Sequence, residues 1–250
     1  MINTGAFTEF EVSVDNHSVS VLEADGTLTV PYAVDRIPIH VAQRYSFVLD
    51  ANQTTSTNYW LRANMITSCF TGTNPVLDSS LKAIISYSGN ETIIPSPDSM
   101  DWASTISVSC HDLNETDLIP MIYSPPPPAD TVYRVDFSFN IGAYALDRAL
   151  VNGTSWSPLT NTTTLIQATD GMNSAHSSSW ELDGTVGAFD DGQFVLGVGS
   201  KGIETVDIVL YSLDEGSHPF HLHGHIFVSP TCSLILMDCF EISANWGFYH

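Results

Sequence analysis

The chain has 250 residues, of which 28 are acidic and 7 are basic, giving a formal net charge of -21. This length corresponds to one or two domains and is enough to bury a hydrophobic core. So negative a surface repels phosphate groups, which excludes nucleic acid as a natural partner and argues against anionic membranes. We also find no window of 18 apolar residues that would predict a membrane span.

Short runs of alternating apolar and polar residues predict an all-β chain. They are rich in Val, Ile, Tyr and Phe and are bounded by Gly, Asn, Asp and Pro, which is typical of a sandwich or barrel. The runs cover residues 10–14, 18–22, 37–41, 44–49, 132–139 and 206–211. Asp25-Gly26 and Asp183-Gly184 predict tight turns. No 11-residue window carries a clear helical stripe.

A proline-rich break suggests two blocks. Pro125–Pro128 form the only dense proline run, and a polyproline stretch is stiff and does not fit a central strand. We therefore expect partial domains at 1–92 and 129–250, joined by a connection at 93–128. The last part of the second block, 230–250, loses the alternation and is interpreted as a divergent, unfinished or foreign tail.

Six Asn-x-Ser/Thr triplets indicate a glycosylated, secreted protein. They lie at Asn16, Asn52, Asn90, Asn114, Asn152 and Asn161. Residues 1–10 lack the basic and apolar regions of a signal peptide, so we expect the N-terminus of the gene product to lie upstream. The four cysteines, Cys69, Cys110, Cys232 and Cys239, contain no CxxC pair, and in a secreted chain one or two disulfides are expected.

The most informative segment is His218-Pro-Phe-His221-Leu-His223-Gly-His225, which holds four of the nine histidines in eight residues. Imidazole is a common ligand of copper and zinc. On a strand, His221 and His223 would point to one face and His218 to the other, so one short strand could serve two metal sites. The alternatives are a tag, a chance surface tract or a single zinc site.

The sequence HPFHLHGH resembles the third copper motif of multicopper oxidases. The segments RYSFVLDANQ (44–53), YWLRANM (59–65) and ALDRALVNGTSW (145–156) are similar to parts of the second and third cupredoxin domains of ascomycete laccase-like enzymes. The resemblance covers roughly residues 1–229. It implies cupredoxin-like Greek-key β-sandwich or barrel domains, here two partial ones.

The resemblance also implies copper ligands. His218 matches a type 1 ligand, His221 a type 2 ligand and His223 a type 3 ligand, while His225 matches a histidine that is usually not a ligand. The intact parent would hold four coppers, act as a monomer, and couple one-electron oxidation of phenolic or similar small-molecule donors to reduction of dioxygen to water. Cys69 and Cys110 resemble a family disulfide.

No functional role is assigned to several other candidate residues. Phe7 stands where phenol oxidases of the family usually place an acidic substrate residue. Glu9, two positions on, could substitute, although a solvated strand carboxylate is favoured. His17, His40, His111 and His176 are isolated and are expected to be structural or exposed. We assign no catalytic or substrate-binding residue.

The family's other copper motifs, of the HWHG, HSH and HCHxxWH kinds, do not occur in these 250 residues. A type 1 site needs a Cys thiolate, so this chain by itself should show no intense blue absorption and no turnover of phenolic dyes. The alternatives to a laccase-like enzyme are a catalytically dead, truncated copper-binding fragment, a parent that oxidises metal ions or ascorbate, and a zinc-binding module. The enzyme interpretation requires the Cys-containing motif downstream and the two-His motifs upstream in the genomic sequence. Metal analysis of the purified protein, with and without copper, separates the zinc-binding module.

Overall fold

The computed structural model describes most of the chain. The described residues are 1–53, 57–70, 72, 74–87, 89, 92–95, 102, 110–125, 127–142, 146–166, 192–196, 203–213, 218–225, 227–228 and, by backbone alone, 239–246. The chain divides into two compact units: Met1–Ser124 with Pro219–Leu222, and Pro125–His218 with His223–His250. The predicted turn at Asp183-Gly184 lies outside the described residues. The assignment of residues 1–92 and 129–250 to second and third cupredoxin domains stays a prediction.

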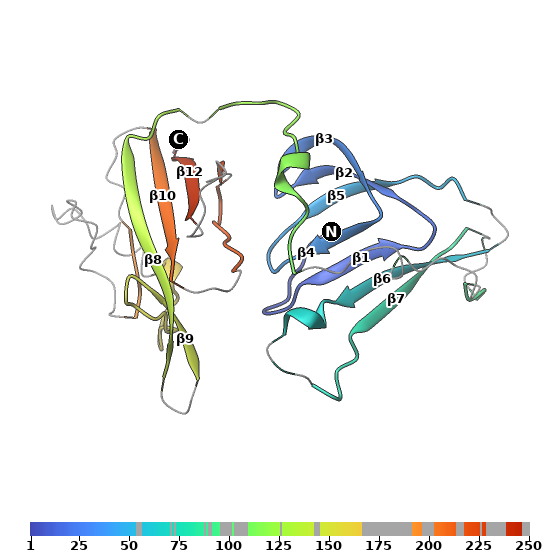
Figure 1. The fold of residues 1–250 in the computed structure, drawn as a ribbon, viewed down its shortest axis with the longest axis horizontal. Coiled ribbons are helices and arrows are strands. Elements are labelled where there is room, and N and C mark those ends of the chain that lie inside the picture. The colour runs from blue at the N-terminus through green and yellow to red at the C-terminus, as the bar shows by residue number, and fades with distance from the viewer. Residues whose placement is uncertain are drawn as a thin grey trace. The chain divides into compact units, whose positions relative to one another are not determined.

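The first unit contains two antiparallel sheets (Figure 1). One has the strand order β4-β1-β6-β7 and the other β3-β2-β5. The strands are β1 (Phe10–Val14), β2 (Val19–Ala24), β3 (Thr27–Val34), β4 (Arg36–Ile39), β5 (Tyr45–Leu49), β6 (Tyr59–Met65) and β7 (Ser80–Ile85). The core takes Ile37 and Ile39 from the first sheet and Val19, Val21 and Tyr45 from the second. The two sheets therefore pack face to face, as in a β-sandwich.

The predicted turn at Asp25-Gly26 is confirmed and closes a two-residue hairpin. Ala24 pairs with Thr27, and Asp25 and Gly26 adopt φ values of 49° and 90°. This backbone suits the twist of paired strands and needs residues that tolerate positive φ. β2 carries a register shift between Val21 and Glu23, which bends this sheet.

Strand β1 departs from the expected pattern of apolar side chains inside and polar side chains outside. It lies between β4 and β6, and its polar side chains are buried, whereas the apolar Phe10 and Val12 are half-buried. The buried polar residues, at alternate positions along and beside the strand, are Glu9, Glu11, Ser13 and Asp15. Because a buried charge is costly unless it is paired, this row needs cationic partners.

Two arginines from the neighbouring strands supply those partners. Arg62 of β6 binds Asp15 through both carboxylate oxygens, at 2.6 and 2.8 Å, and Asp15 is 0% exposed. Arg36 of β4 binds Glu11 at 2.6 Å. Glu9 receives no arginine among the described ion pairs.

The second unit contains a five-stranded sheet with the order β11-β12-β10-β8-β9. Its strands are β8 (Thr131–Ile141), β9 (Asp147–Val151), β10 (Glu204–Ser212), β11 (Phe227–Val228) and β12 (Cys239–Trp246). β8 and β10 are parallel, and the other neighbours are antiparallel. Val135 and Leu210 form its buried core.

The segment 230–250, interpreted as a divergent tail, contains the strand Cys239–Trp246, and its divergent origin stays a prediction. These residues pair with β10 over eight positions, from Glu204↔Trp246 to Tyr211↔Cys239. A strand can form on main-chain hydrogen bonds to a neighbour even where its own sequence lacks clean alternation. Residues 230–238 and 247–250 lie outside the described part.

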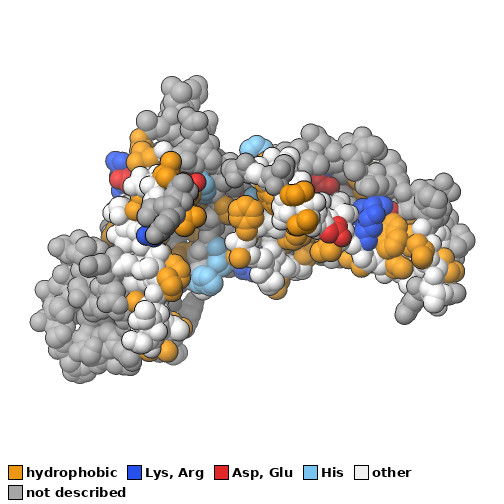
Figure 2. Space-filling view, turned by 90° about the horizontal axis from the view of Figure 1, so that it is seen from below, with side chains coloured by type: hydrophobic (Ala, Val, Ile, Leu, Met, Phe, Trp, Pro, Cys, Tyr) orange, Lys and Arg blue, Asp and Glu red, His pale blue; other side chains and the backbone are white. Residues whose placement is uncertain are grey.

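The all-β prediction is confirmed, since apart from the helical residues 164–166 the described elements are strands and the short 3-10 helices η1 (Thr67–Cys69) and η3 (Glu115–Asp117). Among the described residues, no helix has the length and apolarity needed to cross a bilayer. Figure 2 shows apolar side chains interspersed with polar ones on the face in view. Exposed examples in the first unit are Val30, Val48, Val76 and Leu81.

Candidate functional site

The histidine motif is not a strand, which corrects the expectation that His221 and His223 share a strand face. Residues 218–222 have no regular structure, and His223-Gly224 form a turn in which Gly224 has φ 77°. Pro219 lacks an N–H for a sheet ladder, and a positive φ is incompatible with an extended strand. The orientation of the imidazoles must therefore be set by this irregular backbone.

The motif histidines differ in their surroundings. His218 is half-buried, with its ring centroid 5.0 Å from that of Phe137 and 4.8 Å from that of Phe139, both in β8. The side chains of His221 and His223 are exposed, and histidines reach the surface on the face seen in Figure 2. His225 lies with its Nδ1 3.1 Å from the carbonyl oxygen of His223.

These residues fit copper by their donor chemistry. Imidazole nitrogens are preferred copper ligands, and the His218 ring is packed against two phenylalanines. The thiolate of a type 1 site cannot come from Cys69 or Cys110, because these two, the pair that the resemblance implies, form a disulfide. Cys232 and the side chain of Cys239 lie outside the described part.

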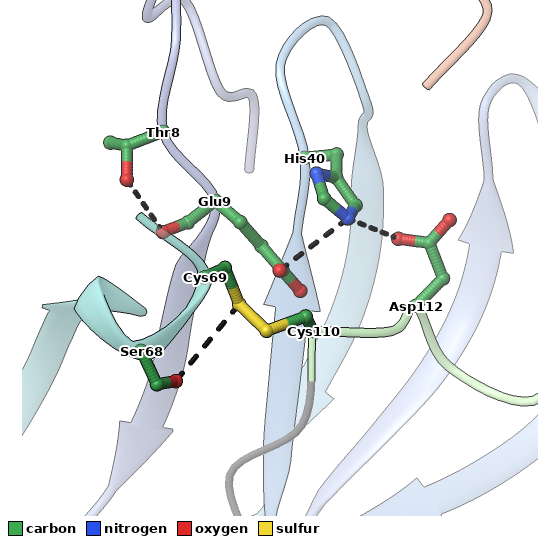
Figure 3. The surroundings of a disulfide bond; sticks show 7 residues. All are labelled: Thr8, Glu9, His40, Ser68, Cys69, Cys110 and Asp112. Atoms are coloured by element: carbon green, nitrogen blue, oxygen red, sulfur yellow. Dashed lines mark hydrogen bonds and ion pairs between the residues drawn. A yellow bond between two sulfur atoms is a disulfide. The ribbon is translucent and has the colours of Figure 1, made fainter. Parts of the chain in front are cut away.

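A second cluster of ligand-type side chains lies in the first unit. Glu9, His40 and Asp112 each place one donor atom within 4.8 Å of the others, the only such trio found in the described part of the chain. His40 Nε2 lies 3.4 Å from a carboxylate oxygen of Glu9 and 3.5 Å from one of Asp112. Figure 3 shows both carboxylates directed at the same imidazole nitrogen.

The strand register explains why Glu9 meets His40. β1 and β4 are antiparallel and pair Phe10 with Ile39, so the next positions outward are Glu9 and His40. Directly opposed residues of an antiparallel pair place their side chains next to each other.

Asp112 is brought to the same place by the disulfide. Cys110, two residues before it, is bonded to Cys69, which lies in η1 just beyond the end of β6. The N–H of Ile66, after β6, donates to the carbonyl oxygen of Glu9 at 3.1 Å. The crosslink thus ties the 110–112 segment to the end of the sheet that carries Glu9 (Figure 3).

Burial dominates the electrostatics of this cluster. Glu9 is 4% exposed, and neither of its carboxylate oxygens accepts a hydrogen bond within the described part. Desolvation, followed by the charge of Asp112, raises the pKa of Glu9 from 4.5 to about 7, although Arg36 acts in the opposite direction. Desolvation also raises the pKa of Asp112, and His40 opposes this.

One sequence-based interpretation is therefore wrong: Glu9 is not a solvated strand carboxylate but a buried one that precedes β1. His40, which is isolated in the sequence, is half-buried and contacts two carboxylates. The alternation around Phe10 carried no signal for this, since the burial of Glu9 depends on segments distant in sequence.

The structure gives the burial of the remaining histidines and of the sequon asparagines that lie in its described part. His17 is structural: its two ring nitrogens lie 2.7 Å from the carbonyl oxygen of Asp15 and 2.7 Å from the hydroxyl of Tyr87. His111 is exposed, and His176 lies outside the described part. Four sequon asparagines are exposed, Asn16 is half-buried and Asn90 is outside the described part. The exposed ones are Asn52, Asn114, Asn152 and Asn161.

Two family models, both described as multicopper oxidase, match residues 1–90 and 158–229 of this chain. One model lies in each of the two blocks, and the second contains the whole histidine motif at 218–225. The chain belongs to the multicopper oxidase family. Its members are copper-dependent oxidoreductases, so membership implies copper as the cofactor.

Curated relatives agree with the family models. Laccase-1 of Trametes villosa is 30% identical over 230 residues, which is 91% of this chain and 39% of that protein. Laccase-2 of Trametes versicolor is 32% identical over 235 residues, 91% of this chain and 40% of that protein. The chain thus spans about two fifths of the length of these relatives. An ascomycete origin stays a prediction.

Solved structures support the fold. The multicopper oxidase Fet3p, which functions in iron import, matches with a TM-score of 0.68 at 20% identity, covering 98% of this chain and 49% of that one. The laccase from Botrytis aclada matches with a TM-score of 0.67 at 22% identity, covering 98% and 45%. These likenesses confirm the expected cupredoxin-like fold class.

Proposed function

We propose that this chain is a section of a secreted, laccase-like multicopper oxidase. The whole protein would oxidise phenolic or similar donors one electron at a time and reduce dioxygen to water. The observation that carries this proposal is the HPFHLHGH motif at 218–225, within a chain that matches the family on both sides of the proline-rich break. The proposal extends to a monomer glycosylated at its exposed sequons.

Within this function, we assign the motif histidines distinct roles. His218 would bind the type 1 copper, which takes electrons from the donor, and the contacts with Phe137 and Phe139 would fix its ring. His221 and His223 would bind the type 2 and type 3 coppers, at which dioxygen is reduced. His225 would support the turn through its contact with the His223 carbonyl oxygen.

Neither Phe7 nor Glu9 offers an accessible carboxylate that would select a phenolic electron donor. Phe7, where the resemblance expects an acid, is 76% exposed and packs on Phe70 with ring centroids 5.2 Å apart. Glu9 cannot replace that acid, because a base must reach the phenolic proton and its carboxylate is buried. We therefore expect broad donor selectivity rather than recognition through a proton-accepting carboxylate.

The test is oxygen-dependent oxidation of a phenolic dye by the copper-loaded, full-length gene product. One O₂ should be consumed for every four one-electron oxidations, since reduction of dioxygen to two waters takes four electrons and four protons. His221→Gln or His223→Gln should abolish oxygen consumption, whereas His218→Gln should abolish the blue absorption. His225→Gln is the matched control and should keep both. An active His221→Gln enzyme would contradict the assignment.

A further inference from the structure

We propose that Glu9, His40 and Asp112 form a binding site for a divalent transition-metal ion, with Zn²⁺ as the ion that its donors suit best. The site uses none of the motif histidines, so it does not depend on the proposed function. It lies at the end of the β1–β4 pair, close to which the Cys69–Cys110 disulfide holds the segment that carries Asp112.

The two distances to His40 match those between donors of a tetrahedral site, and the Glu9 and Asp112 donors lie within 4.8 Å of each other. Zinc ligands of the N and O type lie about 2.0–2.2 Å from the metal, which places neighbouring donor atoms about 3.3–3.6 Å apart. The Nε2 atom of His40 lies 3.4 Å from Glu9 and 3.5 Å from Asp112. These separations are too long for good hydrogen bonds, but they suit donors that share an ion.

The unsatisfied carboxylate of Glu9 is the independent observation. It is buried without a hydrogen bond in the described part, and Figure 3 shows it directed at the cluster. Buried polar groups in folded proteins are hydrogen-bonded with few exceptions, and the ion pair of Glu9 with His40, at 3.4 Å, is too long for a good hydrogen bond. A cation between Glu9, His40 and Asp112 would satisfy it.

Charge and donor type select the class of ion. Two carboxylates and a neutral imidazole carry a charge of -2, which balances a divalent cation. Imidazole favours zinc, copper, nickel and iron over magnesium or calcium. Three protein donors leave a fourth position for water, and the partly exposed side chain of Asp112 leaves this side open to solvent.

The surroundings hold the donors in place. The side chain of Gln43 accepts a hydrogen bond from the backbone N–H of His40 at 2.7 Å, which fixes the main chain there, and it also hydrogen-bonds the side chain of Asp112. A hydrogen bond to a ligating carboxylate orients it toward a metal, as this one would for Asp112. Arg36, whose charge acts on Glu9, is engaged by Glu11 at 2.6 Å.

The experiment measures Zn²⁺ binding to the 250-residue chain after chelator treatment. All samples carry His221→Gln and His223→Gln, which removes the exposed motif donors, and contain excess Mg²⁺ to occupy unspecific carboxylates. Equilibrium dialysis should give one tightly held Zn²⁺ per chain. Glu9→Gln and His40→Gln should each weaken binding about tenfold or more, whereas Asp78→Asn, an exposed carboxylate of the same unit, should not.

A second readout separates a metal ligand from a structural residue. Zn²⁺ should raise the unfolding temperature of the parent and not that of Glu9→Gln, and metal-free Glu9→Gln should unfold no earlier than the parent. Equal Zn²⁺ affinity in the parent, Glu9→Gln and His40→Gln would overturn the proposal. The absence of a tight Zn²⁺ site would also overturn it. Glu9, His40 and Asp112 would then be a cluster that shares protons and binds no metal. If Glu9→Gln does not fold, His40→Gln decides.

Discussion

Replacing Asp15 by asparagine should lower the free energy of unfolding of the first unit by about 3–5 kcal/mol. Asp15 is fully buried and binds Arg62 through two hydrogen bonds of 2.6 and 2.8 Å. The amide keeps the shape of the carboxylate but leaves the guanidinium, itself 8% exposed, without its counter-charge. Hydrogen exchange of peptides from β1 and β6, measured by mass spectrometry, reports this unit specifically.

Two further variants control this experiment. Asp78→Asn changes an exposed carboxylate and should alter the free energy of unfolding by no more than about 0.5 kcal/mol. Asp15→Asn combined with Arg62→Met removes both charges and should recover much of the loss, because the cost comes from an unpaired buried ion. A loss below about 1 kcal/mol for Asp15→Asn would show that the pair is not a main support of the sheet.

Glu9→Gln should stabilise the metal-free chain at neutral pH and have little effect in acid. The pKa of Glu9 is about 7 in the folded chain against 4.5 as the reference value, so the folded state binds this proton more tightly. Stability due to this group is fully present below about pH 4.5 and is lost as the pH rises through 7. The shift corresponds to about 3 kcal/mol at most.

Denaturant unfolding in the presence of a chelator, repeated between pH 4 and pH 8, checks this prediction. The curves of the parent and Glu9→Gln should coincide at the acid end and diverge as the pH rises, with the variant the more stable. Asp78→Asn should follow the parent throughout. Parallel curves for the parent and Glu9→Gln would show that Glu9 titrates normally and is not buried as described.

The sequence predicted those strands whose side chains alternate strongly. Phe10–Val14, Tyr45–Leu49 and the core of β10 were all found from alternation. β7 and β9 were missed because most of their residues are exposed, so burial imposed no pattern on their sequences. β12 was missed because its place in the sheet depends on pairing with β10, which lies 27 or more residues earlier in the chain.

Of the two candidate sites, likewise, only the one formed by residues close together in the sequence could be predicted. The histidine motif was visible because its ligands are neighbours in sequence, although its backbone is not the strand that the spacing suggested. The Glu9 cluster was invisible because its members come from three separate segments, two joined by strand register and the third by the disulfide. Local patterns give no information on contacts created by long-range pairing.

Anomalous diffraction at the copper edge, from crystals of the copper-loaded, full-length gene product, tests the assignment of the motif histidines. We expect one copper bonded to an imidazole nitrogen of His218 and others bonded to His221 and His223. Anomalous peaks elsewhere in the protein, with none within bonding distance of His221 and His223, would contradict it.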